Sequence, residues 1–149
     1  ALHLQGIRKL IIVNGHGGNS FKNMIRDLSV DFPDFLIAIT NWYGIVPQEG
    51  YFENKDDHAG ELETSVMMYY HPELVNLEEA GEGTSKPFAL SSLNAQIAWL
   101  PRYWSKVSAD TGIGDPRKST PEKGERYAKA VIEKLALLFT EIGSKEVYL

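Results

Sequence analysis

The sequence contains no cysteine, which excludes disulfide bonds and thiolate metal ligands. This absence is compatible with the cytoplasm, where we expect the protein to reside. The net charge is −5 over 149 residues, and no basic stripe of the kind that binds nucleic acid is present. No apolar run is long enough to span a bilayer, and the first residues lack a cleavable signal pattern. We therefore expect neither nucleic acid nor membrane among its partners.

The hydrophobic pattern predicts an α/β fold built on a parallel strand pair. Short apolar runs at 9–13 and 35–40 are typical of buried strands, and apolar residues at helical spacing lie between them at 20–32, with Ser20 as the expected N-cap. Two such strands joined by a helix form a βαβ unit. The opening "ALHLQG" resembles the last turn of a helix closed by Gly6. Because there is no initiator Met, we expect upstream residues to be missing.

The rest of the chain predicts further helices and one weak strand. A helix is expected over 60–70, ended by His71-Pro72, and a weak strand over 96–104. A long helix is expected to begin at Pro121, to be capped by Thr120 and to run to about residue 142. Without repeats or linkers, the pattern indicates one α/β domain over 1–149.

The glycine-rich stretch "NGHGGN" at 14–19 follows the first strand, where open α/β folds place ligands. It has three interpretations. A dinucleotide-type phosphate loop would need a third glycine where Ser20 stands, and an acid where the second strand ends at Asn41. A tight turn with a surface histidine is the second. The third is a metal site in which Asn14 or Asn19 fixes the imidazole of His16.

The stretch "DDHAGELETS" at 56–65 places carboxylates and a histidine where a loop becomes a helix. Asp56, Asp57 and Glu61 suit the positive end of a helix dipole without any further role. Glu63 shares a helical face with Met67 and Tyr70, which we expect to be buried. A carboxylate at the head of an apolar face needs a metal ion or a buried partner to neutralise it.

Histidine 58 lies five residues before Glu63, which is the wrong spacing for one helical face. If His58 belongs to the preceding loop and Gly60 opens the helix, both side chains can still reach one pocket. His58 and Glu63 would then line one pocket, and a solvated, acid-rich first turn of the helix is the alternative.

These two stretches and the later "GIGDPRKSTPEKG" at 112–124 resemble, in order and spacing, the creatininase (creatinine amidohydrolase) family. The resemblance covers nearly all of this chain but about the second half of a typical member. It implies a three-layer α/β/α fold with a mostly parallel sheet, here apparently lacking its N-terminal half. It also implies a homo-oligomer, often a hexamer, that hydrolyses a C–N amide bond with a metal-activated water.

The resemblance also implies roles for individual residues. His16 matches the metal-binding histidine, and His58 matches the histidine that contacts substrate and transfers a proton to the leaving nitrogen. Glu63 matches a glutamate that completes the metal site or orients a ligand, so it is both a metal and a catalytic candidate. The backbone N–H groups of Gly17 and Gly18 are candidates for binding the substrate oxyanion.

Two further residues complete the candidate list. Asp57 and Trp42 are candidate substrate-binding residues, although Asp57 and Glu61 are expected to do mainly local structural work. In creatininase itself, an acidic ligand of the second metal follows two places after the motif histidine. This chain has Gly18 at that place, so it resembles other branches of the family.

The resemblance leaves the metal site incomplete. The family's Glu-x-His pair and bridging aspartate belong to its first half, and His3 lacks that context. We therefore expect the missing ligands of one or two Zn, Mn or Fe ions to come from an N-terminal segment or another chain.

The implied substrate is creatinine or a related cyclic amide or formamide, while relatives also trim a cofactor-precursor peptide. The alternative is a non-catalytic oligomeric relative that has lost a complete site.

Aromatic residues gather in two places. Trp42, Tyr43 and Tyr51 follow the second strand and suit either a substrate wall or, more simply, packing. A second group, Trp99, Tyr103 and Trp104, is expected to form a subunit interface.

Overall fold

The computed structural model describes residues 1–55 and 57–148, so Asp56 and Leu149 lie outside the described residues. The chain divides into two units, one formed by Ala1–Pro47 with Lys129–Leu149 and the other by Gln48–Ala128. Each unit is described by itself. The prediction of one domain over 1–149 stays a prediction.

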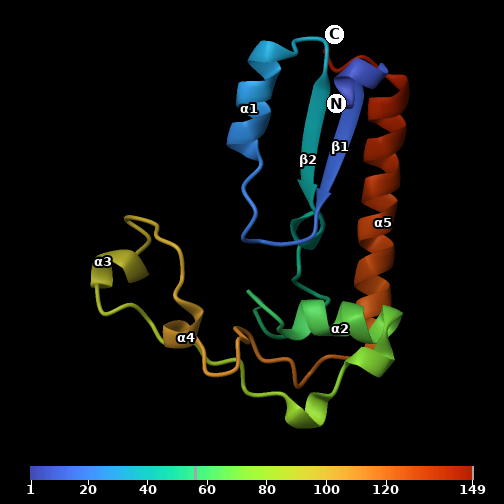
Figure 1. Cartoon of the computed structure of the whole chain (residues 1–149). Coiled ribbons are helices and arrows are strands. Elements are labelled where there is room, and N and C mark those ends of the chain that lie inside the picture. Colours follow the sequence, from blue (N-terminus) through green and yellow to red (C-terminus); the bar gives the residue numbers. More distant parts are fainter. Residues whose placement is uncertain (56, 149) are drawn as a thin grey trace. The chain divides into compact units, whose positions relative to one another are not determined.

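The first unit contains the predicted βαβ element. Strands β1 (Lys9–Asn14) and β2 (Leu36–Asn41) pair in parallel, from Lys9 opposite Leu36 to Asn14 opposite Asn41. Helix α1 (Lys22–Asp31) connects them and lies beside β2, while the C-terminal part of α5 (Pro121–Ser144) lies beside β1 (Figure 1). The α/β class predicted from the hydrophobic pattern is confirmed.

The strands are less buried than their apolar runs predict. Val13 is 45% exposed, and Asn14 is the one buried residue among the two described strands. A parallel strand becomes fully buried when strands flank both edges and helices cover both faces. In the described part of the chain the sheet has two strands, so each strand keeps one unpaired edge.

The ends of the first-unit elements confirm one predicted cap and contradict another. Gly6 closes the 3₁₀ helix η1 (His3–Gln5) with a φ of +88°, a left-handed conformation that favours glycine. Ser20 does not cap α1, because the helix begins two residues later with Phe21 as the N-cap and without a side-chain cap bond.

The second unit contains α2 (Glu61–Tyr70), opened by Gly60 and closed at His71 as predicted. Short helices follow along the chain: η3 (Pro72–Leu74), η4 (Leu77–Glu79), α3 (Ser91–Asn94) and α4 (Trp104–Val107). The weak strand predicted over 96–104 is wrong. Gln96 has a φ of +59°, and Pro101 cannot donate to a ladder, so neither suits an extended paired segment.

Helix α5 begins as the sequence predicts. The Thr120 hydroxyl accepts a hydrogen bond from the Lys123 amide at 3.2 Å, and Pro121 takes the first helical position. Within the second unit, Tyr127 is fully buried and packs edge-on against Tyr51 and Phe52, with ring centroids 5.4 and 5.2 Å away. Burial raises the pKa of Tyr127 to about 12.

Close backbone contact fixes α5 against α2. A β-carbon on Gly124 would lie 2.0 Å from the carbonyl oxygen of Ser65, which is itself fully buried. Only glycine lets the two helices approach this closely. Within residues 1–55 and 57–148, none of the helices combines the length and apolar character that crossing a membrane requires.

Candidate functional site

The loop that carries His16 is folded around the side chain of Asn14. Asn14 is 3% exposed, and its amide donates to the His16 carbonyl and to Asn41 Oδ1, both at 2.8 Å. Its Oδ1 accepts from the His16 amide at 3.3 Å and from Asn19 Nδ2 at 2.9 Å. A single buried amide thus shapes the turn at the carboxyl end of β1, and the Asn19 side chain binds that amide in turn.

The glycines of this loop make room for side chains. A β-carbon on Gly18 would lie 2.7 Å from Nε2 of His16, so the imidazole occupies the space that a side chain at position 18 would fill. A β-carbon on Gly17 would lie 3.8 Å from the Tyr43 hydroxyl oxygen, which is an ordinary van der Waals distance. Gly18 is therefore tied to the position of the His16 ring.

Trp42 closes one side of the same loop. It belongs to η2 (Trp42–Gly44), and its indole N–H donates to the carbonyl of Gly15 at 3.4 Å. Its ring meets that of Tyr43 edge-on, with centroids 6.2 Å apart. Trp42 and Tyr43 therefore both pack on the glycine loop.

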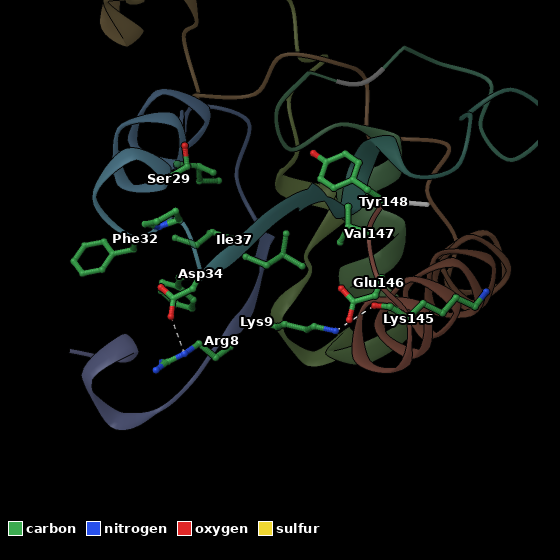
Figure 2. Close-up of a pocket in the computed structure, with 14 residues that line it drawn as sticks. Arg8, Lys9, Ser29, Phe32, Asp34, Ile37, Lys145, Glu146, Val147 and Tyr148 are labelled. Carbon is green, nitrogen blue, oxygen red and sulfur yellow. Dashed lines mark hydrogen bonds and ion pairs between the residues drawn. The ribbon is translucent and has the colours of Figure 1, made fainter.

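The first unit also has a cavity of about 540 Å³ at the amino ends of the strands, away from the His16 loop (Figure 2). Arg8 beside it pairs with Asp34 at 3.1 Å, and the Lys9 ammonium donates to the carbonyls of Ile142 and Lys145 near the end of α5. These cations already have protein partners, and the ammonium suits the negative end of the helix dipole.

In the second unit, the backbone of His58 is held by the segment that matches the third motif. The His58 amide donates to the carbonyl of Ile113 at 2.9 Å, and the Ile113 amide donates back to His58 at 2.8 Å. The imidazole lies against the indole of Trp104, with ring centroids 4.8 Å apart. The two distant segments therefore meet at His58.

Glu63 lies in the first turn of α2 and binds the loop that precedes it. Its Oε2 accepts from the amide of Ala59 at 2.7 Å, and Ala59 has a φ of +52°, which is unusual for a residue with a β-carbon. The expected burial of Met67 and Tyr70 beside it is wrong, because these side chains are 40% and 51% exposed. Glu63 therefore does not head a buried apolar face, and its place on α2 does not by itself require a metal ion or a buried partner.

The buried carboxylate of this stretch is Glu61. It is fully buried; its Oε2 accepts from the amides of Glu53 and Asn54 at 3.0 and 2.8 Å, and its Oε1 accepts from the Lys123 ammonium at 2.6 Å. The hydrogen bond to Glu61 raises the pKa of Lys123. Lys118 and Lys123 both bind Glu53, and they lower the pKa of that carboxyl. Lys123 and two backbone amides thus compensate the buried charge of Glu61, in keeping with its expected structural role.

Asp57 forms an ion pair that the sequence does not predict. Its two carboxylate oxygens accept from the two terminal nitrogens of Arg102, at 2.7 and 2.6 Å. This two-point contact raises the pKa of Arg102. Arg102, Trp104 and Lys123 are the contacts that sequence reasoning missed. The first two lie in the segment assigned to a weak strand, whereas Lys123 lies inside the third motif.

The predicted metal ligands are of types that bind divalent cations, but they are too few to form a complete site. Imidazole and carboxylate are donors that zinc and manganese accept. Among the described side chains, no three of histidine, cysteine, aspartate and glutamate come together as a metal site. His16 belongs to the first unit, while His58 and Glu63 belong to the second, so their convergence on one ion stays a prediction.

Comparison with known proteins gives the class and the family. Solved creatininases, among them a Zn-Zn type and a Mn form, superpose with TM-scores of 0.70 and 0.71 over 93% of this chain and 57% and 58% of theirs. At 22–23% identity they show the fold, which is that of the creatininases. The family model described as creatininase, creatinine amidohydrolase, matches residues 1–139, so the chain belongs to this family.

Individual relatives agree with that assignment. A structure from Bacteroides fragilis NCTC 9343, provisionally assigned as a creatinine amidohydrolase, is 62% identical with a TM-score of 0.94 over 99% of this chain and 59% of its own. The mycofactocin precursor peptide peptidase of Mycobacterium ulcerans is 30% identical over 84% of this chain and 45% of its own length. The creatinine amidohydrolase of Pseudomonas putida is 22% identical over 88% and 54%. The chain thus spans about half the length of the curated relatives it matches.

Proposed function

We propose that this protein is a metal-dependent amidohydrolase that cleaves a C–N amide bond. The observation that carries the proposal is the family match, which spans all three motif stretches of the chain. The geometry supports it, because His58 and Glu63 are both fixed where α2 begins. The lactam of creatinine and the peptide bond are both amides, so relatives named for either substrate support the same reaction type.

His16 and Glu63 would supply some of the ligands of one or two Zn, Mn or Fe ions. The remaining ligands would come from an N-terminal segment or from another chain. When bound, such an ion polarises the amide carbonyl and lowers the pKa of a bound water. Solved relatives whose descriptions name Zn and Mn support a divalent metal ion.

The other candidate residues would act on the substrate directly. The imidazole of His58 would hold the proton that the leaving nitrogen needs. The amides of Gly17 and Gly18 would donate to the oxygen on which negative charge develops. Trp42 would contact the substrate from the glycine loop, and Asp57 would do so through a carboxylate that already binds Arg102.

Alanine variants of three histidines test these roles in the protein loaded with metal. We expect His16→Ala to lose metal and turnover together, and His58→Ala to keep metal but lose turnover. His71→Ala is the matched control, because His71 is an exposed residue that pairs with Glu73. Metal content is measured by elemental analysis. Unchanged metal in His16→Ala, or full activity in His58→Ala, would contradict the assignment.

The substrate is proposed as creatinine or a related cyclic amide or formamide. A panel of creatinine, an N-formylated amine and a short peptide would separate these classes. Turnover of the first or second supports the proposal. Turnover of the peptide alone would move the protein to the peptidase side of the family, where one curated relative is named.

A non-catalytic oligomeric relative is the second candidate. Two points motivate it: the resemblance places Gly18 where creatininase has an acid, and the described residues hold no three-ligand cluster. Substoichiometric metal in a protein with intact His16 and Glu63 would support this alternative against the hydrolase.

We also propose that the protein forms a homo-oligomer, with a hexamer as the expected size. Ile97, Trp99 and Tyr103 are 78%, 85% and 71% exposed within the second unit, and such aromatic surface is typical of interfaces. Sedimentation velocity tests this directly, since a monomer at micromolar concentration would contradict it.

A further inference from the structure

We propose that Trp104 is a positioning residue that fixes the imidazole of His58, and that Arg102 and Asp57 hold Trp104 in place. This inference rests on the proposed function, in which His58 transfers a proton. The His58 and Trp104 rings lie with centroids 4.8 Å apart and planes inclined at 52°. Because the backbone of His58 is already paired with Ile113, the indole acts on the part of the residue that still rotates.

Trp104 is itself held from the loop that carries His58. The Arg102 guanidinium lies 5.7 Å from the centre of the Trp104 ring, a cation–π distance. The same guanidinium donates to both oxygens of Asp57, the residue next to His58. The contacts therefore form a closed circuit, Asp57–Arg102–Trp104–His58, which we call the aromatic clasp. Its members lie in one unit, so the clasp does not depend on how the two units are placed.

The far end of α4 anchors the clasp. The Val107 carbonyl, at the end of the helix that Trp104 begins, accepts from the Lys86 amide at 2.7 Å. Next along the chain, the hydroxyl of Ser108, which is 8% exposed, donates to the Gly112 carbonyl at 2.9 Å. That turn leads straight to Ile113, which pairs with His58. The segment from Trp104 to Ile113 thus contacts both the ring and the backbone of His58.

The chemistry explains why such a clasp matters. A general acid must present its proton within hydrogen-bond reach of the leaving atom. A misplacement of about 1 Å can cost about a hundred-fold in rate. The clasp removes freedom from the imidazole without contacting the reacting atoms. Its loss is therefore expected to lower kcat more than it raises KM.

The first test is spectroscopic and needs no substrate. In the full protein labelled at the histidine rings, His58→Gln identifies the NMR resonances of the His58 imidazole. We expect Trp104→Leu to move the His58 ring resonances more than those of the other histidines. Trp104→Phe keeps a ring and should move them less. Leu90→Ala is the control, because Leu90 lies in the same unit and is 61% exposed. Unmoved His58 resonances in Trp104→Leu would overturn the clasp.

The second test separates positioning from substrate binding. With whichever panel substrate is turned over, Trp104→Leu should lower kcat by about ten- to a hundred-fold with little change in KM. Trp104→Phe should recover much of that loss. A raised KM with unchanged kcat would show that Trp104 binds substrate, and would overturn the positioning role. If no substrate is turned over, the proposed function fails while the spectroscopic test still decides the clasp.

Arg102 gives an independent check of the circuit. Lysine keeps the charge but cannot make the planar two-point contact with both oxygens of Asp57 that the guanidinium makes. We expect Arg102→Lys to move the His58 resonances in the same direction as Trp104→Leu, by a smaller amount. No movement in Arg102→Lys would remove Arg102 and Asp57 from the clasp.

Discussion

The position of the His16 ring depends on the absence of a side chain at position 18. A β-carbon there would lie 2.7 Å from His16 Nε2, and the imidazole can swing away at little cost in stability. We therefore expect Gly18→Ala to weaken zinc binding by about ten-fold or more, as losses of ligand orientation do, with little change in Tm. Calorimetric titration with zinc would measure the affinity.

Gly15→Ala is the control for this prediction. A β-carbon on Gly15 meets no atom within 4 Å, so this variant should bind zinc as the parent does. Equal zinc affinity in the Gly18 and Gly15 variants would mean that the His16 ring does not depend on Gly18.

The buried pair of Glu61 and Lys123 makes a second prediction about single side chains. Lys123→Met leaves a fully buried carboxylate without its cation, which we expect to lower the free energy of unfolding by roughly 3 kcal/mol. Urea denaturation would measure it. Lys134→Met, on the exposed surface of α5, should change stability by less than about 0.5 kcal/mol. A loss below about 1 kcal/mol in Lys123→Met would show that water replaces the ammonium.

Among the helices, the crossing of α2 and α5 determines where the motif at 56–65 is held. Gly124→Ala would drive a β-carbon into the Ser65 carbonyl, so the helices must separate. We expect a loss of about 1–3 kcal/mol, the usual cost of overpacking. Gly143→Ala, in the same helix with open space around it, should instead be neutral or stabilising by up to about 1 kcal/mol. Thermal unfolding of the two variants makes the comparison, and equal Tm values would contradict the close crossing.

For the molecule as a whole, ion pairs predict how stability depends on pH. Hydrogen bonds from Arg117 lower the pKa of Asp115 to about 2. A carboxyl with a depressed folded pKa stabilises the fold above its unfolded pKa of about 3.9, and that contribution is lost as pH falls from about 4 to 2. We expect Asp115→Asn to flatten the fall of Tm over this range.

Arg117→Gln should flatten the same part of the Tm profile, because it removes the partner that depresses the Asp115 pKa. Other carboxyls keep some dependence on pH in both variants, since Lys118 lowers the pKa of Glu53 and His3 lowers that of Asp34. An unchanged slope between pH 4 and 2 in both variants would show that Asp115 is not a stabilising carboxylate.

The sequence by itself determined the local elements and the family. Apolar periodicity placed β1, α1, β2, α2 and α5 within a few residues, because helix and strand periods and helix ends are written in neighbouring residues. The three motif stretches resembled the creatininases, and the family match confirms it. Ser20 failed as a cap, because α1 begins two residues later, at Lys22. The segment 96–104 failed as a strand, because Gln96 has a positive φ and Pro101 has no amide hydrogen to donate.

Tertiary structure alone decided which charged and aromatic groups meet. Burial falls on Glu61 rather than on the face of Glu63, since the Lys123 ammonium reaches Glu61 from 62 residues along the chain and two amides of the preceding loop also bind it. Asp57 finds Arg102 and His58 finds Trp104 across more than forty residues of chain. The hydrophobic periodicity of the sequence does not predict such pairings, because they depend on how distant loops are placed against one another in the fold. Local sequence specifies an element; the energy of a buried charge or of a stacked ring is set by neighbours that only folding brings close.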